Sequence, residues 1–291
     1  MPKNSAIYVA VERRVQRALR AAAKESSPEN VHRLRTSIRR AEVLLAGHLP
    51  ASHKRLVKLR RELQKVRRRA GKVRDIDVQL NALRSLDLGR PDNSREQLAR
   101  FLKEKREKRA KKLGSLLDSG GRSHLRRHLS ELGEDLKAHG NGQKSRAKAV
   151  KHLRKTLEKL LRSASQPQTF TQEKLHDFRM LCKRARYAAE QADKKGHAEL
   201  IARLRHMQDA VGTWHDWLTL GATARKKLTA NPSPFLAAVR NITQSKLWEA
   251  VHVCRQNLPD VIRLAKDANV DVSSAKPPAS ASSPKAQAAS A

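Results

Sequence analysis

Two segments of this chain, about 140 residues apart, carry the same arrangement of residue types. Residues 31–40 and 175–184 both read apolar, His, any residue, apolar, Arg, two residues of any kind, apolar, basic, basic, if cysteine is counted as apolar. Some forty residues later comes a second match, because residues 71–75 and 212–216 each begin with glycine and end with aspartate. Two signatures in the same order, at nearly the same separation, predict two copies of one structural unit. The division between the copies is expected near residues 140–145.

Helical periodicity runs through both copies. Strand-like alternation is almost absent and aromatic residues make up only 3% of the chain, so we predict an all-α fold. Ser27 before Pro28 is typical of a helix start, and Ser94 with Gln97 is interpreted as a capping box. Apolar residues that recur three and four positions apart form the expected core stripe: Leu19, Leu34, Ile38, Leu45, Leu56, Leu59, Leu63 and Val66.

The predicted organisation is two helical-bundle repeats and a tail. The repeats are expected at about 1–142 and 143–266 and together form one domain, 1–266. Residues 267–291 are rich in Ala, Ser, Pro and Lys and are predicted to be disordered, since this composition cannot bury a core.

The repeated segments concentrate positive charge beside the core stripe. At 100° per residue, His32, Arg35 and Arg39 fall within about 60° of one another, and the Leu34 and Ile38 stripe lies about 100° away. The second copy has the same stripe, made of these residues with Tyr187 at its border: His176, Arg179, Lys183 and Arg186. Like charges at this spacing repel, so ordering them beside a core favours a bound anion.

The overall charge also points to a polyanionic partner. With 63 Lys and Arg against 28 Asp and Glu, the formal net charge is +35, which nucleic acid, an anionic membrane surface or inorganic polyphosphate would neutralise. Asp75 and Asp216 are interpreted as helix caps or ion-pair partners of the arginines. Basic residues outside the repeated motif are expected to form solvated faces: Arg13, Arg14, Lys103, Arg106, Lys108, Lys111 and Lys112.

Several function classes find no support in the sequence. Cys182 and Cys254 are the only cysteines, and neither a signal peptide nor an apolar run of 18 residues occurs, so a cytoplasmic protein without membrane contact is expected. His124 and His128 have zinc-like spacing, but no glutamate follows His124 as in zinc proteases. We therefore predict no catalytic residues, no metal site and no cofactor.

The motifs of the two copies, taken together, resemble the CHAD family, the conserved histidine α-helical domain. The match consists of His32-x-x-Arg35-x-x-x-Arg39-Arg40 with residues 73–78, then residues 176–187 with residues 208–216, and it extends over roughly residues 5–260. The resemblance implies two four-helix-bundle-like halves related by a pseudo-twofold axis around a basic central groove. It also implies binding of inorganic polyphosphate and association with polyphosphate granules.

Carried over onto this sequence, the resemblance gives a set of candidate polyphosphate-binding residues: His32, Arg35, Arg39, Arg40, Arg74, His176, Arg179, Lys183, Arg184, Arg186 and Tyr187. The two copies differ at two positions of the pattern. His215 stands where the first copy has Arg74, and Glu42 stands where the second copy has Arg186. The halves are therefore not expected to contribute equally.

Two other functions remain open at this stage. A basic nucleic-acid-binding protein is one, although stacking on single strands favours interleaved aromatics, and Trp214, Trp217 and Trp248 occupy apolar helical positions expected in the core. A metal-dependent phosphohydrolase is the other, suggested by the His-Asp dipeptides at residues 176–177 and 215–216. Such a site needs several ligands around the metal, whereas the neighbours of these dipeptides are mostly cations.

Overall fold

The described part of the chain consists of amphipathic helices joined by short connections. The computed structural model describes residues 3–48, 53–89, 92–139, 142–165, 170–193, 195–228 and 233–267. The nine helices in these ranges are α1 (Lys3–Lys24), α2 (Pro28–His48), α3 (Lys54–Ser85), α4 (Asn93–Gly114), α5 (Ser119–His139), α6 (Gly142–Ala164), α7 (Gln172–Asp193), α8 (Ala198–Lys227) and α9 (Pro234–Asp267). Strands are absent from the described residues, which confirms the predicted all-α fold.

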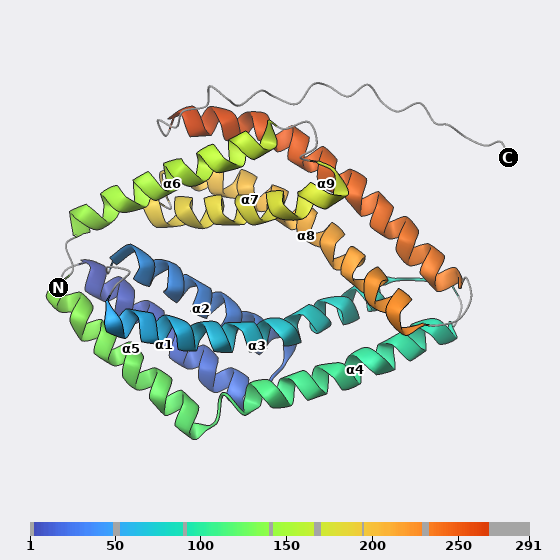
Figure 1. Ribbon diagram of the computed structural model, residues 1–291, viewed down its shortest axis with the longest axis horizontal. Helices are drawn as coiled ribbons and strands as arrows, with labels where there is room; N and C mark the ends of the chain where they lie inside the picture. Colours follow the sequence, from blue (N-terminus) through green and yellow to red (C-terminus); the bar gives the residue numbers. More distant parts are fainter. Residues whose placement is uncertain are drawn as a thin grey trace.

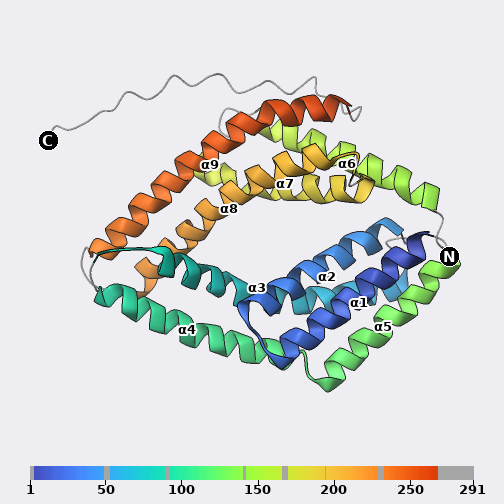
Figure 2. The same cartoon turned by 180° about the vertical axis from the view of Figure 1, so that it is seen from behind.

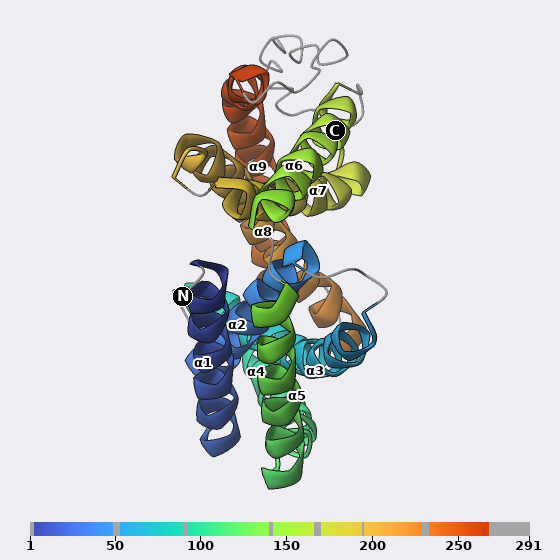
Figure 3. The ribbon, with the colours of Figure 1, turned by 90° about the vertical axis from the view of Figure 1, so that its left-hand side faces the viewer.

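The helices form two layers, which we call the first half (α1–α5) and the second half (α6–α9) (Figure 1). In the first half, α2 packs between α1 and α3, and in the second half α7 packs between α6 and α8 in the same order. The end-on view in Figure 3 shows the halves stacked, with α8 extending from one to the other. The predicted boundary between the repeats, at residues 142–143, falls at the start of α6.

Apolar burial is divided among three cores. One lies within the first half and contains the predicted stripe, from Leu19 to Val66, and another lies within the second half around Phe178 and Trp214. The third core joins the halves: Ile76 and Leu98 of the first half pack there with residues such as Leu220 and Phe235 of the second. Figure 2, from behind, shows the ends of α3, α4, α8 and α9 meeting at this shared core.

The fourth side of each bundle is built differently in the two halves. In the first half it is made by two helices, because α4 packs along α3 and, after a break at residues 115–118, α5 packs on α1 and α3. In the second half the single helix α9 packs along α8 and also contacts α6. Its Phe235 lies in the shared core, and its Leu258 lies in the core of the second half.

Helix starts follow local capping chemistry, with one correction. Ser27 caps α2 as predicted, since its Oγ accepts a hydrogen bond from the backbone N–H of Asn30 at 3.3 Å. The predicted capping box at Ser94 is wrong: the N-cap of α4 lies two residues earlier, at Asp92, which accepts from the N–H of Arg95 at 2.9 Å. An aspartate carboxylate next to the first turn displaces the serine because it is the stronger acceptor for a helix N-terminus.

Two predictions from the sequence pattern, for Arg106 and Trp248, are wrong. Arg106 is not on a solvated face; its guanidinium pairs with the buried Asp77 of α3 and donates to the carbonyl of Ser26 at 2.6 Å, which links α4 to α3 and to the connection between α1 and α2. Trp248 is not in the core, since 59% of it is exposed on α9, whereas Trp214 and Trp217 are buried as expected.

The predictions about the C-terminal tail and about membrane contact concern residues that the structure describes only in part. The predicted disordered tail, residues 267–291, lies outside them apart from Asp267, the last residue of α9. No helix in the described ranges is long and apolar enough to cross a membrane.

Candidate anion-binding cavity

A cavity of about 720 Å³ lies between the two halves, and four helices supply its walls. We call it the central cavity. On one side are α2 and α3, and on the other are α7 and α8. Eight Arg or Lys side chains line it: Arg35, Arg39, Arg67, Arg74, Arg179, Lys183, Arg186 and Arg205. Three carboxylates share the lining, from Asp75, Asp209 and Asp216. Positive charge therefore exceeds negative charge in the cavity.

The α2 wall has the orientation that the stripe analysis predicts. Leu34 and Ile38 are fully buried in the first-half core, and this fixes the rotation of the helix about its axis. The neighbouring stripe, with Arg35 and Arg39, then faces the second half across the cavity. A hydrogen bond links α7 to α2, because the Gln191 side chain donates to the backbone carbonyl of Val43 at 3.1 Å.

The α7 wall repeats this arrangement. Phe178 and Cys182 are fully buried in the second-half core, and Arg179, Lys183 and Arg186 line the cavity. The predicted cationic stripes of both copies thus face each other across one space.

Three of the predicted site residues lie elsewhere. Arg40 and Arg184 are exposed and do not line the central cavity, since each is turned about 100° from the inward-facing residue before it. Arg184 lines an adjoining depression of about 440 Å³, which shares Arg39, Arg67 and Tyr187 with the central cavity. His176 is exposed, with its ring centroid 5.0 Å from that of His215, which does line the cavity.

The structure adds two arginines that the sequence analysis missed, Arg67 and Arg205. Arg67 comes from α3 and pairs with Glu42 of α2, with 2.8 Å between Nε and the carboxylate. In the second half the roles are reversed: Arg186 of α7 occupies the position of Glu42 and donates from Nε to Gln208 of α8 at 3.2 Å. Each half therefore sends an arginine into the cavity from this helix pair, but from opposite helices.

Aspartates at the second repeated motif face the arginines. Asp75 lies 3.6 Å from the guanidinium of Arg35, which agrees with its interpretation as an ion-pair partner. Asp216, at the equivalent position of α8, lines the same cavity. Burial, which outweighs the attraction of Arg179, raises the pKa of Asp216 to about 6.

Burial and the crowding of cations disfavour the protonated form of Lys183. Burial, together with the nearby Arg39 and Arg179, lowers the pKa of Lys183 to about 7. Burial is also the main cause that lowers the pKa of Arg35 and Arg39, and neighbouring arginines add to it. On the same wall as Lys183, burial and the nearby Arg179 lower the pKa of His215 to about 4. An anion in the cavity would relieve this repulsion.

One buried donor at the cavity has no acceptor among the described residues. Nε of Arg179 is buried and makes no hydrogen bond with any described residue. A buried donor without a partner costs free energy, about 1–3 kcal/mol, which a ligand oxygen would recover. Gly212 faces this side chain, since a Cβ built at Gly212 would lie 3.6 Å from Nε and Nη2 of Arg179.

Tyr187 holds two of the arginines in place. Its ring centroid lies 4.8 Å from Cζ of Arg39 and 4.2 Å from Cζ of Arg186, so guanidiniums from opposite halves stack on one aromatic ring. Among the described residues that line the cavity, Tyr187 is also the only Phe, Tyr or Trp.

Comparison with known proteins places the chain in a family. A CHAD domain family model matches residues 10–225, so the chain belongs to the CHAD domain family. The crystal structure of the CHAD domain from the plant Ricinus communis is similar in fold, with a TM-score of 0.58 and 20% sequence identity over 91% of this chain and 90% of that one. The family match ends within α8, and the structural similarity extends the comparison into α9. No curated protein matches the sequence.

Proposed function

We propose that this chain binds inorganic polyphosphate in the central cavity and does not hydrolyse it. The observation that carries the proposal is the convergence of eight Arg and Lys side chains from both halves on one space with only three aspartates. Guanidiniums form paired hydrogen bonds with phosphate oxygens, and rigid helices hold them at little entropic cost. Arg179 supports the proposal because its Nε is a donor that still needs an acceptor.

The shape and chemistry of the lining favour a thin anionic chain over nucleic acid. Single-stranded nucleic acid binds where bases stack on aromatic rings. Here the ring of Tyr187 is already covered by Arg39 and Arg186, and Trp214 and Trp217 are buried in the cores. Polyphosphate has no bases and needs only the cations.

Binding without hydrolysis fits the surroundings of the cavity aspartates. Arg35 is paired with Asp75, and the positive charge of Arg179 attracts the Asp216 carboxylate. A divalent cation at these aspartates would therefore be repelled by the arginines. The proposal extends to the cell: a chain that binds polyphosphate is expected at polyphosphate granules in the cytoplasm.

A competition experiment tests the proposal. Labelled long-chain polyphosphate is bound to the full chain at fixed salt and then displaced by unlabelled polyphosphate or by duplex DNA at equal phosphate concentration. We expect polyphosphate to displace the label at a concentration at least tenfold below that of DNA, with or without EDTA. We also expect affinity to fall steeply as salt rises, because bound counterions are released. Equal displacement by DNA would mean a general polyanion binder, and phosphate release in the presence of magnesium would mean an enzyme.

A further inference from the structure

A cluster of possible metal ligands lies between α3 and α5, away from the central cavity. His124 and His128, one turn apart on α5, both face Glu62 of α3. Nε2 of His124 lies 2.9 Å from Oε1 of Glu62, and Nδ1 of His128 lies 2.9 Å from Oε2. The three ligand atoms all lie within 4.8 Å of one another. None of the three residues lines the central cavity.

We propose that Glu62, His124 and His128 bind one zinc ion, or another transition-metal ion of similar preference, that cross-links α3 and α5. Two imidazoles and one carboxylate are a ligand set that zinc accepts, with a fourth position left for water. Zinc needs bonds of about 2.0–2.2 Å to such ligands, which small side-chain rotations would provide from the observed spacing. In zinc proteases the glutamate of the His-Glu-x-x-His motif acts as a base, whereas here Glu62, from another helix, would be the third metal ligand.

Burial of the cluster suits a site that is open on one side. The His128 side chain is 9% exposed and that of Glu62 is 19% exposed, whereas the His124 side chain is 41% exposed. A metal ion would therefore be held by the two more buried ligands and reached from the side of His124.

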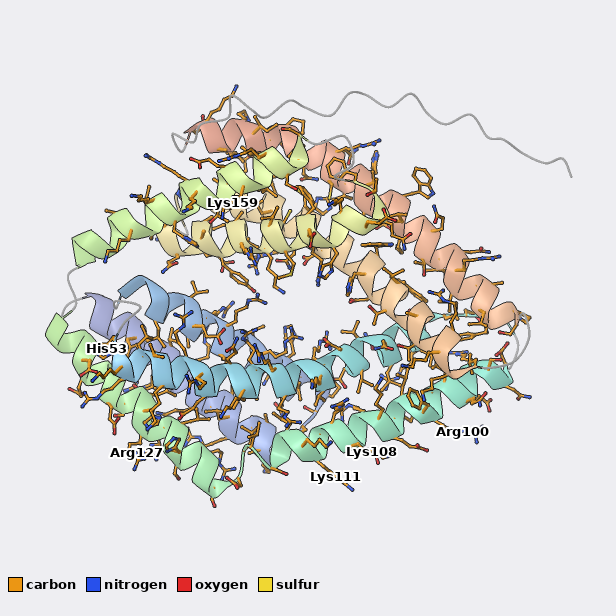
Figure 4. The ribbon with its side chains drawn as sticks, in the orientation of Figure 1. His53, Arg100, Lys108, Lys111, Arg127 and Lys159 are labelled. Atoms are coloured by element: carbon orange, nitrogen blue, oxygen red, sulfur yellow. The ribbon has the colours of Figure 1, made fainter. Side chains whose placement is uncertain are left out.

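In the absence of metal, Arg127 determines which ring nitrogen of His124 carries the proton. Its guanidinium lies 3.2 Å from Nδ1 of His124, and because arginine only donates, Nδ1 accepts and Nε2 carries the proton that faces Glu62. Metal binding at Nε2 replaces that proton, and Nδ1 must then be protonated for the ring to stay neutral. Arg127 must consequently move away, which its 65% exposed side chain allows. Figure 4 shows Arg127 at the outer side of α5.

The test uses the full chain, stripped with EDTA and free of polyphosphate, with cobalt and zinc as probes. We expect one equivalent of Co²⁺ to give the intense visible absorption of a four-coordinate site, and Zn²⁺ to displace it and raise the Tm. Glu62→Gln, which keeps the shape but removes the anionic ligand, should abolish the absorption and weaken Zn²⁺ binding at least tenfold. His152→Ala removes an exposed histidine of α6 and is the matched control, expected to bind like the wild type.

Two further variants keep the proposal open to refutation. Arg127→Gln should tighten Zn²⁺ binding severalfold, since it removes the donor that opposes the metal-bound form of His124. If Glu62→Gln does not fold by circular dichroism, His124→Gln at the more exposed ligand replaces it with the same expected loss. Absence of stoichiometric binding by the wild type would overturn the proposal. Unchanged binding by a folded ligand variant would overturn it too, because the ion would then lie elsewhere. Neither outcome bears on polyphosphate binding in the central cavity.

Discussion

On the α2–α3 side of the central cavity the four strongly basic side chains are all arginines, whereas the α7–α8 side has Lys183 at the position of Arg39 and His215 at the position of Arg74. An arginine keeps its charge at any physiological pH. Lys183 and His215 do not, because their pKa values are lowered to about 7 and about 4. The arginines of the α2–α3 wall thus keep a fixed charge, whereas Lys183 makes the charge of the α7–α8 wall adjustable near neutral pH.

The two walls nevertheless share a pair of arginines at equivalent positions, Arg35 and Arg179, and here the largest effect is expected. Each charge-assisted contact to phosphate is worth about 1.5–3 kcal/mol. Arg35→Ala with Arg179→Ala should therefore weaken polyphosphate binding by about a hundredfold to ten-thousandfold, measured by calorimetric titration. The single variants show whether the halves contribute equally.

The matched control removes the same charge from outer faces. Arg13 and Arg100 are exposed, and Figure 4 shows Arg100 on the outside of α4. Arg13→Ala with Arg100→Ala should cost less than tenfold, since screening limits such attraction to about 8 Å in physiological salt. Arg106 is unsuitable as a control because it is paired with Asp77. Equal losses from the inner and outer pairs would mean diffuse electrostatics and no defined site.

Because Lys183 on the α7–α8 wall titrates near neutral pH, we expect the affinity for polyphosphate to change about tenfold with pH. Lys183 is charged below its pKa of about 7 and must be charged to pair with phosphate, so affinity for long-chain polyphosphate should fall as pH rises from 6 to 8. Asp216, with a pKa of about 6, changes charge in the same direction, so the titrations are best compared in the Asp216→Asn background. There, Lys183→Arg should flatten the dependence, and Arg39→Lys should leave it at least as steep. A flat profile for the unmodified chain would exclude this difference between the walls.

A smaller effect is expected where the halves exchange the positions of arginine and its partner. Glu42 of α2 pairs with Arg67 of α3, whereas Arg186 of α7 donates to the neutral Gln208 of α8 and pairs with Glu190 of its own helix. Glu42→Gln should therefore tighten polyphosphate binding about two- to fivefold, and Gln208→Glu should weaken it by a similar factor. A gel shift at two salt concentrations measures both. Changes in the same direction would show that these two pairs are not equivalent.

The parts of the site that sequence could predict are those fixed within a single helix. His32, Arg35 and Arg39 follow from rotation of 100° per residue beside a buried stripe, and the same geometry excludes Arg40, which only the family resemblance implies. The residues missed depend on how helices pack. Arg67 is defined by the position of α3 against α2, and Glu62 meets His124 only when α5 packs on α3. No spacing along one segment contains that information.

The last prediction concerns Tyr187, whose aromatic ring connects the two walls. Its ring contacts the guanidiniums of Arg39 and Arg186, and each contact at a partly exposed site is worth about 0.5–1 kcal/mol. Tyr187→Leu should release both arginines and weaken polyphosphate binding about three- to tenfold, whereas Tyr187→Phe keeps the ring and should bind like the wild type. Calorimetry should assign the loss to entropy, because the freed arginines must be ordered again on binding. If Tyr187→Phe loses as much affinity as Tyr187→Leu, the hydroxyl contacts phosphate itself, and Tyr187 is a ligand to polyphosphate instead of a support for the arginines.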